Sequence, residues 1–234
     1  MTRHVLVTGA NRGIGRSIAT AFVAAGYTVS SIHRSGNLPE GVHSAIADIT
    51  DTDAVNAAFD ALEAEHGRVE ILVANAGITK DGLLMRMSDE DFETVLDVNL
   101  AGTFRCVRRA TNSMLRQRFG RIILVGSVVG LMGNPGQVNY SSSKSALVGM
   151  ARSITREVGG RGITANVIAP GFITTDMTDE LPEDVKKQYE ASIPAKRFGA
   201  AEEVAAAAVY LASDAAGYVS GAVLPVDGGL GMGH

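Results

Sequence analysis

The chain has 234 residues, of which 46% are hydrophobic and 20% are charged, and its formal net charge is -4. These values are typical of a globular protein, and the acidic balance does not favour a nucleic-acid partner. The single cysteine, Cys106, excludes an intramolecular disulfide and favours a reducing compartment. No apolar run approaches the roughly 20 residues of a membrane span, and the N-terminus shows no signal-peptide layout, so we expect a cytoplasmic protein.

Apolar, strand-like runs alternate with helical patterns along the whole chain. The strands are expected near residues 4–8, 28–32, 43–46, 69–74, 121–126, 162–168 and 222–226. The helices are expected near residues 14–25, 52–65, 89–117, 138–158, 180–189 and 201–212. This alternation, with no repeat or linker, predicts a single Rossmann-type α/β domain over residues 1–234. It would be a doubly wound parallel sheet of about seven strands with helices on both faces.

The first strand is followed at once by a glycine-rich loop, Gly9 to Gly15, and then by the first helix. Glycines at 9, 13 and 15 allow a tight turn and a close ligand approach. The helix N-terminus beyond them offers unpaired N–H groups to a pyrophosphate. The spacing G-x-x-x-G-x-G differs from the G-x-G-x-x-G dinucleotide fingerprint, so a glycine turn without function stays an alternative.

A second motif combines Tyr140, Lys144 and the preceding Ser127. On a helix, the spacing of Tyr140 and Lys144 places both side chains on one face. We expect the Lys144 ammonium to favour the phenolate and so lower the pKa of Tyr140. Such a phenol exchanges a proton with a carbonyl oxygen, which the Ser127 hydroxyl would polarise. Many helices contain Tyr-x-x-x-Lys by chance. The motif becomes evidence for a catalytic site because the same chain also contains the glycine-rich loop.

Together, these motifs resemble the short-chain dehydrogenase/reductase family over almost the whole chain. Thr8 to Gly15 is similar to the family's cofactor loop, and Asn75-Ala76-Gly77 to the segment that stabilises the central sheet. Pro170 to Thr175 resembles the loop that holds the nicotinamide carboxamide. The catalytic tetrad of the family falls at Asn99, Ser127, Tyr140 and Lys144. The residues expected to bind the cofactor are Gly9, Asn11, Arg12, Gly13, Ile14, Gly15, Arg34, Asp48, Ile49, Asn75, Ala76, Gly77, Tyr140, Lys144, Pro170, Gly171, Ile173 and Thr175.

The residues after the second strand favour NADP over NAD. An NAD site has an acidic residue for the ribose 2′-hydroxyl, but the strand here ends in His33 and Arg34 without a carboxylate. Arg34 and Arg12 could converge on a 2′-phosphate, or they could be two solvated surface side chains. Asp48 resembles the family's adenine contact, or it could mark the N-terminus of the next helix.

The connection between the second and third strands, residues 34–42, departs from the family. It carries Gly36, Pro39 and Gly41 and is too short for a crossover helix, which needs a dozen or more residues. We therefore expect a loop where the family usually has a helix. The departure concerns the adenosine end of the expected cofactor site and not the catalytic end.

The resemblance implies hydride transfer between a nicotinamide and a substrate carbonyl. Tyr140 would donate a proton to the developing alkoxide, Lys144 would also bond the nicotinamide ribose, and Asn99 would hold a water that connects Lys144 to solvent. A serine hydrolase is the rival interpretation, but Ser127 lacks the final glycine of G-x-S-x-G. The five histidines are scattered, so neither a His partner nor a metal site is expected.

Further segments resemble the bacterial 3-oxoacyl-acyl-carrier-protein reductases, in particular their actinobacterial branch. These segments are residues 75–81, 84–87, 194–197, 226–229 and 229–234. The resemblance implies reduction of a β-keto acyl thioester in fatty-acid biosynthesis. Another carbonyl substrate (a polyketide, acetoacetyl-CoA, a sugar or a cyclic ketone) or a non-enzymatic NADP-binding regulator are the alternatives.

An apolar entrance for the acyl chain could be formed by residues 83–87, Leu131-Met132 and Phe172-Ile173. Flexible methionines suit a variable chain, although the same residues could equally be core or subunit contacts. The segment from Ile173 to Leu181 resembles a lid over cofactor and substrate.

The resemblance also implies partners. The acyl carrier protein is acidic, and Arg116, Arg118, Arg121 and Arg161 fall at helix–strand junctions. We expect Arg118 and Arg161 to form its docking patch, with a solvated basic face as the alternative. The family is usually tetrameric, so we expect helices 89–117 and 138–158 at one interface and residues 215–233 at another.

Overall fold

One parallel sheet of seven strands organises the protein. The computed structural model describes residues 2–174 and 182–232. The strand order is β3-β2-β1-β4-β5-β6-β7, and every pair of neighbours is parallel. The strands are β1 (His4–Thr8), β2 (Thr28–His33), β3 (Val42–Ile46), β4 (Val69–Ala74), β5 (Gly120–Val125), β6 (Ile163–Pro170) and β7 (Val223–Val226). The predicted fold class is confirmed, and the order reverses between β1 and β4.

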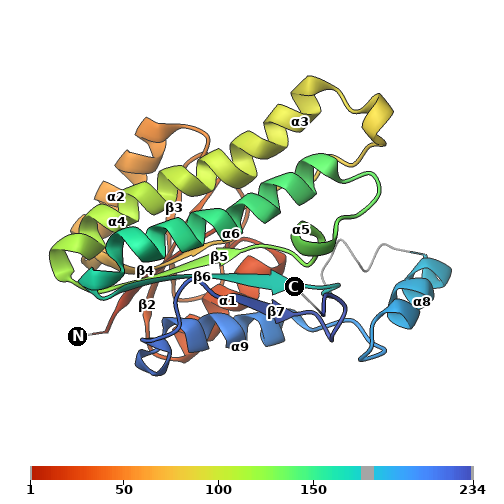
Figure 1. The fold of residues 1–234 in the computed structure, drawn as a ribbon. Helices are drawn as coiled ribbons and strands as arrows, with labels where there is room; N and C mark the ends of the chain where they lie inside the picture. Colours follow the sequence, from red (N-terminus) through yellow and green to blue (C-terminus); the bar gives the residue numbers. More distant parts are fainter. Residues whose placement is uncertain (1, 175–181, 233–234) are drawn as a thin grey trace.

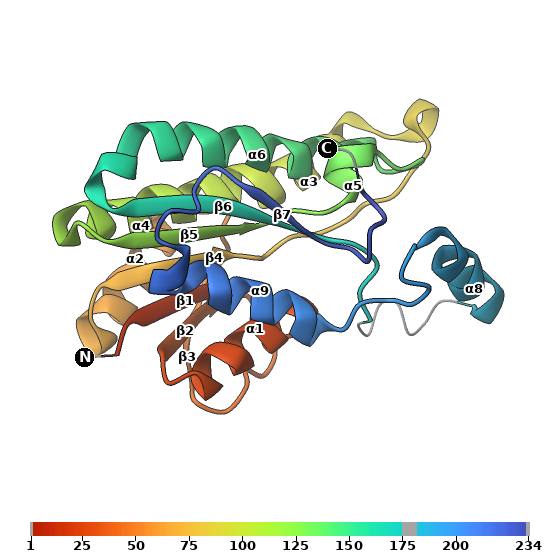
Figure 2. The same cartoon turned by 60° about the horizontal axis from the view of Figure 1, so that its bottom comes forward.

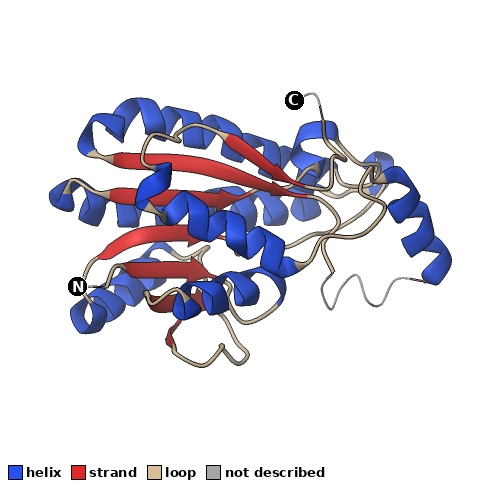
Figure 3. Cartoon of the chain, turned by 90° about the horizontal axis from the view of Figure 1, so that it is seen from below, coloured by secondary structure: helices blue, strands red, loops and turns tan. Residues whose placement is uncertain are grey.

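Helices cover both faces of this sheet (Figures 1 and 3). On one face lie α1 (Gly13–Ala24) and α9 (Ala201–Ala212). The other face carries α2 (Thr52–His66), α4 (Thr103–Gln117) and α6 (Val138–Val158), with α3 (Asp89–Leu96) packed on α6. Two further helices, α5 (Val129–Met132) and α8 (Glu183–Ser192), lie beside the carboxyl edge of the sheet (Figure 2). The single-turn helices are η1 (Leu84–Arg86), η3 (Gly159–Arg161) and η4 (Asp214–Ala216).

The sheet separates two hydrophobic cores. Alternate residues of each central strand point to opposite faces, so Leu72 of β4 packs with Phe59 of α2, while Val73 packs with Phe22 of α1. Phe22 and Phe59 are fully buried. Because both faces are covered, the central strands are continuous apolar runs, and for this reason the sequence pattern predicted their positions.

The direct connection between β2 and β3 is confirmed, since residues 34–41 contain no helix. Leu38 packs against the core beneath α1, and Arg16 Nη1 of α1 donates a hydrogen bond of 3.0 Å to the Asn37 carbonyl. Gly41 lies against Val23 of the same helix. The short loop is therefore held against α1 beside the adenosine end of the expected cofactor site.

The helix predicted over residues 89–117 is interrupted. A π-helical segment, η2 (Asp97–Gly102), separates α3 from α4 and contains Asn99. Within it, the backbone of Gly102 approaches Ile49 so closely that a Cβ there would lie 2.8 Å from the Ile49 side chain. Such single π-turns occur frequently at functional sites, and no hydrophobic pattern marks them.

Helix α8 stands away from the body of the molecule (Figure 2). It begins at Glu183, directly after Pro182, and none of its residues is buried. Its Tyr189 ring stacks on Phe172 with a centroid distance of 4.3 Å. Within the described ranges, no helix has the length and apolar character needed to cross a membrane.

Candidate active site

A cleft of about 750 Å³ opens at the carboxyl ends of the strands. This is the edge at which parallel α/β sheets bind ligands, next to the point where the strand order reverses. The predicted residues that line the cleft are Gly9, Asn11, Arg12, Gly13, Ile14, Gly15, Arg34, Asp48, Ile49, Asn75, Ala76, Gly77, Ser127, Tyr140, Lys144, Pro170, Gly171 and Ile173. Asn99 is buried behind the cleft, and Thr175 lies outside the described residues, as does most of the expected lid.

Hydrogen bonds join the glycine loop to the end of β4. The Thr8 hydroxyl accepts from the backbone N–H groups of Asn75 and Ala76, each at 3.0 Å. Asn75 Nδ2 donates to the carbonyls of Thr8 and Gly9 at 3.1 and 3.3 Å. A Cβ at Gly15 would lie 2.3 Å from the Gly9 oxygen and 2.4 Å from Asn75 Nδ2, so only glycine fits there. The loop is therefore fixed with its backbone facing the cleft.

The N-terminus of α1 is available to an anion. Its N-cap residue, Arg12, makes no side-chain capping bond, and the first turn contains no acidic residue. The first N–H groups of a helix have no partner within the helix, and they bind phosphate readily. Together with the glycine cradle, this end of the cleft fits the pyrophosphate of a dinucleotide.

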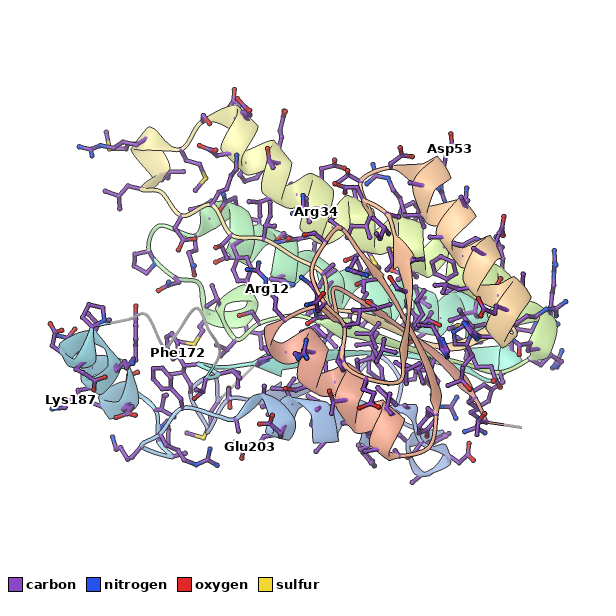
Figure 4. All side chains as sticks on the ribbon, turned by 180° about the vertical axis from the view of Figure 1, so that it is seen from behind. Arg12, Arg34, Asp53, Phe172, Lys187 and Glu203 are labelled. Carbon is purple, nitrogen blue, oxygen red and sulfur yellow. The ribbon has the colours of Figure 1, made fainter. Side chains whose placement is uncertain are left out.

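Arg12 and Arg34 both line the cleft at this end (Figure 4). Arg34 Nη1 lies 3.7 Å from Asp48 Oδ2, and its side chain is about two-thirds exposed. Asp48 Oδ1 accepts from the backbone N–H and hydroxyl of Thr50, which together with Arg34 hold the pKa of Asp48 below its ordinary value. Asp48 is not the N-cap of α2, because Asp51 accepts the first N–H groups of that helix.

Tyr140 and Lys144 lie one turn apart on α6, at the inner wall of the cleft. Lys144 Nζ donates a 2.8 Å hydrogen bond to the Val125 carbonyl at the end of β5 and lies 5.7 Å from the centre of the Tyr140 ring. Burial lowers the pKa of Lys144 to about 8. Burial also raises the pKa of Tyr140, opposed by its hydrogen bond with the Ser127 hydroxyl and reinforced by the negative charge of Asp81.

The expected lowering of the Tyr140 pKa by Lys144 is therefore wrong for this structure. The ammonium donates to a backbone carbonyl, and the loss of solvent around the phenol is the largest influence on its pKa. The expected contact between Ser127 and Tyr140 is present. Tyr140 therefore lines the cleft with its phenol bonded to the Ser127 hydroxyl and with its pKa above the ordinary value.

Asn99 uses its side chain to hold the site together. Asn99 Oδ1 accepts from the Ile78 N–H at 2.8 Å, and Nδ2 donates to the Ile78 carbonyl at 3.0 Å and to Ser143 Oγ at 3.1 Å. Both amide hydrogens are used, so they are not available to the water expected there. Gly77 keeps the space between Asn99 and Lys144 open, since a Cβ would lie 3.1 Å from Asn99 Oδ1 and 3.4 Å from Lys144 Nζ.

Some cleft residues were not predicted. His33 and Ser35 flank Arg34, and Val98 precedes Asn99, so their proximity to predicted residues was the available signal. Of the expected apolar entrance, Phe172 and Ile173 line the cleft. Leu83, Leu84, Met85 and Met132 are exposed and lie outside its lining.

Comparison with known proteins decides the family. The family described as enoyl-(acyl carrier protein) reductase matches residues 9–231. The 3-oxoacyl-[acyl-carrier-protein] reductase MabA of Mycobacterium tuberculosis (strain ATCC 25618 / H37Rv) is 51% identical over 234 residues, which cover 100% of this chain and 95% of that protein. The chain belongs to the short-chain dehydrogenase/reductase family.

A second group of relatives agrees with this membership. The 3-oxoacyl-[acyl-carrier-protein] reductase FabG of Escherichia coli (strain K12) is 45% identical over 235 residues, which cover 97% of this chain and 96% of that protein. Membership confirms the predicted family and implies an oxidoreductase with a nicotinamide cofactor. The uncapped N-terminus of α1 and the glycine cradle fit such a cofactor.

The geometry of Gly15 leads to a first prediction. Gly15→Ala should weaken pyridine-nucleotide binding at least about tenfold, because the new methyl group displaces the Gly9 carbonyl or Asn75 from the cradle. Nucleotide titration by intrinsic or cofactor fluorescence measures the effect. Gly160→Ala is the matched control, since a Cβ at Gly160 meets nothing within 4 Å. Equal affinities for the two variants would contradict the proposed cradle.

Burial of Lys144 leads to a second prediction. Its pKa is about 8 in the folded protein against 10.5 for a free side chain, so folding disfavours the charged form by about 3 kcal/mol below pH 8. This cost disappears as the pH rises from 8 to 10.5. In urea unfolding, the free energy of unfolding of Lys144→Met should therefore exceed that of the parent most below pH 8. This difference should shrink as the pH rises above 8. Lys187→Met, on the exposed face of α8 (Figure 4), should show no such trend.

Proposed function

We propose that this protein uses NADPH to reduce the 3-oxo group of an acyl thioester, carried on acyl carrier protein or CoA, to the 3-hydroxyacyl thioester. The supporting observation is a protonated Tyr140 that is hydrogen-bonded to Ser127 inside the nucleotide-binding cleft. The relatives that match the chain at 45–51% identity over nearly their whole length are named for this reaction. We place the protein in the cytoplasm, in fatty-acid biosynthesis, and treat residues 1–234 as one domain.

NADPH, when bound, supplies the hydride to the carbonyl carbon. The protein supplies the proton and the orientation. Tyr140 donates its hydroxyl hydrogen to the developing alkoxide, and the Ser127 hydroxyl donates a hydrogen bond to the same oxygen. The raised pKa of Tyr140 keeps the phenol protonated before the reaction and favours its return to that state afterwards. Lys144 and Asn99 hold the surrounding backbone, at Val125 and Ile78 respectively.

The choice of NADP rests on Arg12 and Arg34. No carboxylate ends β2, and Asp48 is engaged by Thr50. Among the described residues, Arg12 has no ion pair, while Arg34 has only the long contact to Asp48. Two guanidinium groups at the adenosine end suit a 2′-phosphate, whereas a carboxylate at this place would repel it.

The expected carrier docking patch needs a second subunit. Arg118 and Arg161 precede β5 and β6, while the cleft lies where these strands end. The eight residues of β6 span roughly 26 Å, so a carrier at this patch is far from the cleft of the same subunit. Antiparallel pairing of α4 and α6 with their copies in a homotetramer would bring the patch beside the partner's cleft. Arg121 does not contribute, because it is 5% exposed.

The reaction itself is tested by the initial rate of NADPH oxidation with acetoacetyl-acyl carrier protein, with NADH and crotonyl-acyl carrier protein in parallel reactions. An NADPH-specific rate with the 3-oxoacyl substrate is expected. Tyr140→Phe should lower this rate by roughly 10²–10⁴-fold and keep NADPH affinity, because only the proton donor is removed. Turnover of the enoyl substrate alone, or an active Tyr140→Phe variant, would contradict the proposal.

Arg34 is tested through cofactor choice. Arg34→Ala should weaken NADPH binding roughly tenfold or more and leave NADH binding nearly unchanged, since a charged hydrogen bond to the 2′-phosphate is lost. Dissociation constants for both cofactors provide the measurement. Arg68→Ala, an exposed residue outside the main cleft, is the control. A parallel loss for NADPH and NADH would show that Arg34 acts on the loop and not on the phosphate.

A further inference from the structure

Buried polar side chains hold both backbone groups of Tyr140. The Tyr140 N–H donates to Asn139 Oδ1 at 2.7 Å, and the Tyr140 carbonyl accepts from Ser143 Oγ at 2.7 Å. Asn139 and Ser143 are both fully buried. Neither residue lines the cleft, so they can act on the reaction only through neighbours such as Tyr140.

Asn139 joins the first turn of α6 to the segment that leads into α3. Its Nδ2 donates to the Lys80 carbonyl at 2.9 Å and to the Asp91 carbonyl at 3.3 Å. The side-chain amide therefore uses its oxygen and both of its hydrogens on backbone groups of three different residues, which fixes its plane. Figure 1 shows the start of α6 beside α3, and the two helices are in contact.

Ser143 ties Tyr140 to the same segment by a second route. Ser143 Oγ accepts from Asn99 Nδ2 at 3.1 Å, and Asn99 in turn bonds the N–H and the carbonyl of Ile78. Ile78 lies on the wall of the cleft. Both backbone groups of Tyr140 are thus connected to residues 78–80.

The Tyr140 hydroxyl is separated from the backbone by the length of the side chain, so a small rotation of this helical turn moves the hydroxyl further than the backbone. A displacement of about 1 Å at a reacting group can cost about 10²-fold in rate. We propose that Asn139 and Ser143 are positioning residues that hold Tyr140 by its backbone and set the direction of its phenol relative to residues 78–80 of the cleft wall. This rests on the proposed function, which assigns Tyr140 as the proton donor.

The first test separates kcat from binding. Asn139→Ala should lower kcat for acetoacetyl-acyl carrier protein by about tenfold or more, with little change in KM or in the dissociation constant of NADPH. The two segments stay connected in this variant, because the Gly82 N–H still donates to the Gly136 carbonyl at 2.8 Å. Asn56→Ala removes the same side chain from an exposed position on α2 and should match the parent. An unchanged kcat for Asn139→Ala, or equal losses of turnover and of NADPH binding, would overturn the proposal.

The Tyr140→Phe background separates positioning from a general loss of structure. Once the proton donor is absent, its placement no longer affects the rate. Asn139→Ala should therefore change the residual rate of NADPH oxidation in Tyr140→Phe by less than about twofold. A residue that only supports the fold would cause a similar loss in both backgrounds, and such additivity would contradict the assignment.

Ser143→Ala is a milder second variant, because alanine suits a helix interior and only the hydroxyl is lost. It should lower kcat by about threefold or more, again without an effect on NADPH affinity and again only while Tyr140 is present. If Asn139→Ala does not fold, this variant decides alone, and an unchanged kcat refutes the proposal.

Amide hydrogen exchange tests the contact without turnover. The Tyr140 N–H belongs to the first turn of α6, where N–H groups lack a partner within the helix, so its protection depends on Asn139. In Asn139→Ala its exchange should be at least about tenfold faster. The Ser141 N–H, bonded to the Gln137 carbonyl at 2.7 Å, is the internal reference. Equal exchange of the Tyr140 N–H in parent and variant would show that Asn139 does not hold it. If the parent reduces no 3-oxoacyl thioester, the proposed substrate fails, while exchange still decides whether Asn139 holds Tyr140.

Discussion

The hydrogen bonds between Thr8 and the Asn75–Ala76 backbone fix the point on which the rest of the site depends. They join the ends of β1 and β4, the two strands between which the order of the sheet reverses. The chain leaves β1 and β4 toward opposite faces of the sheet, so a crevice opens between the two loops that follow these strands. The hydrogen bonds of Thr8 fix the width of this crevice. Asn75 also bonds the backbone of the glycine loop. The cradle at one end of the cleft and Gly77 at the other are thereby set by a single junction.

The inner wall of the cleft, around Lys144, is built at the expense of stability. Lys144 is 5% exposed and has a backbone carbonyl, not a carboxylate, as its partner. A carboxylate at this place would fix the ammonium and add a negative charge beside the phenol, and the cost of burying both charges could exceed their attraction. Poorly compensated groups of this kind are common at functional sites, where proteins give up stability for activity.

The sequence was most informative where one physical cause dominates. The strands agree with their predicted bounds to within two residues, because a sheet covered on both faces requires continuous apolar runs. Residues that line the cleft followed from motif spacing at the strand ends. The direction of the Lys144 ammonium, the capping of α2 by Asp51 and not Asp48, and the distance of Arg118 from the cleft did not follow. The first and third depend on contacts between segments far apart in the chain, which a local pattern does not encode, whereas the capping by Asp51 is a local contact with the N–H groups of Asp53 and Ala54.

The π-helical segment Asp97–Gly102 has a consequence for the phase of the helix that contains it. Helix α3 packs on α6 and buries Val95, while α4 directs Cys106 and Ala110 into the core between the sheet and α2. An uninterrupted α-helix advances about 100° per residue and would present one stripe to both surroundings. The wider turn absorbs an extra residue and rotates the second half relative to the first. Asn99 thus lies where the buried side of the helix changes direction, so that α3 and α4 pack on two differently oriented surfaces.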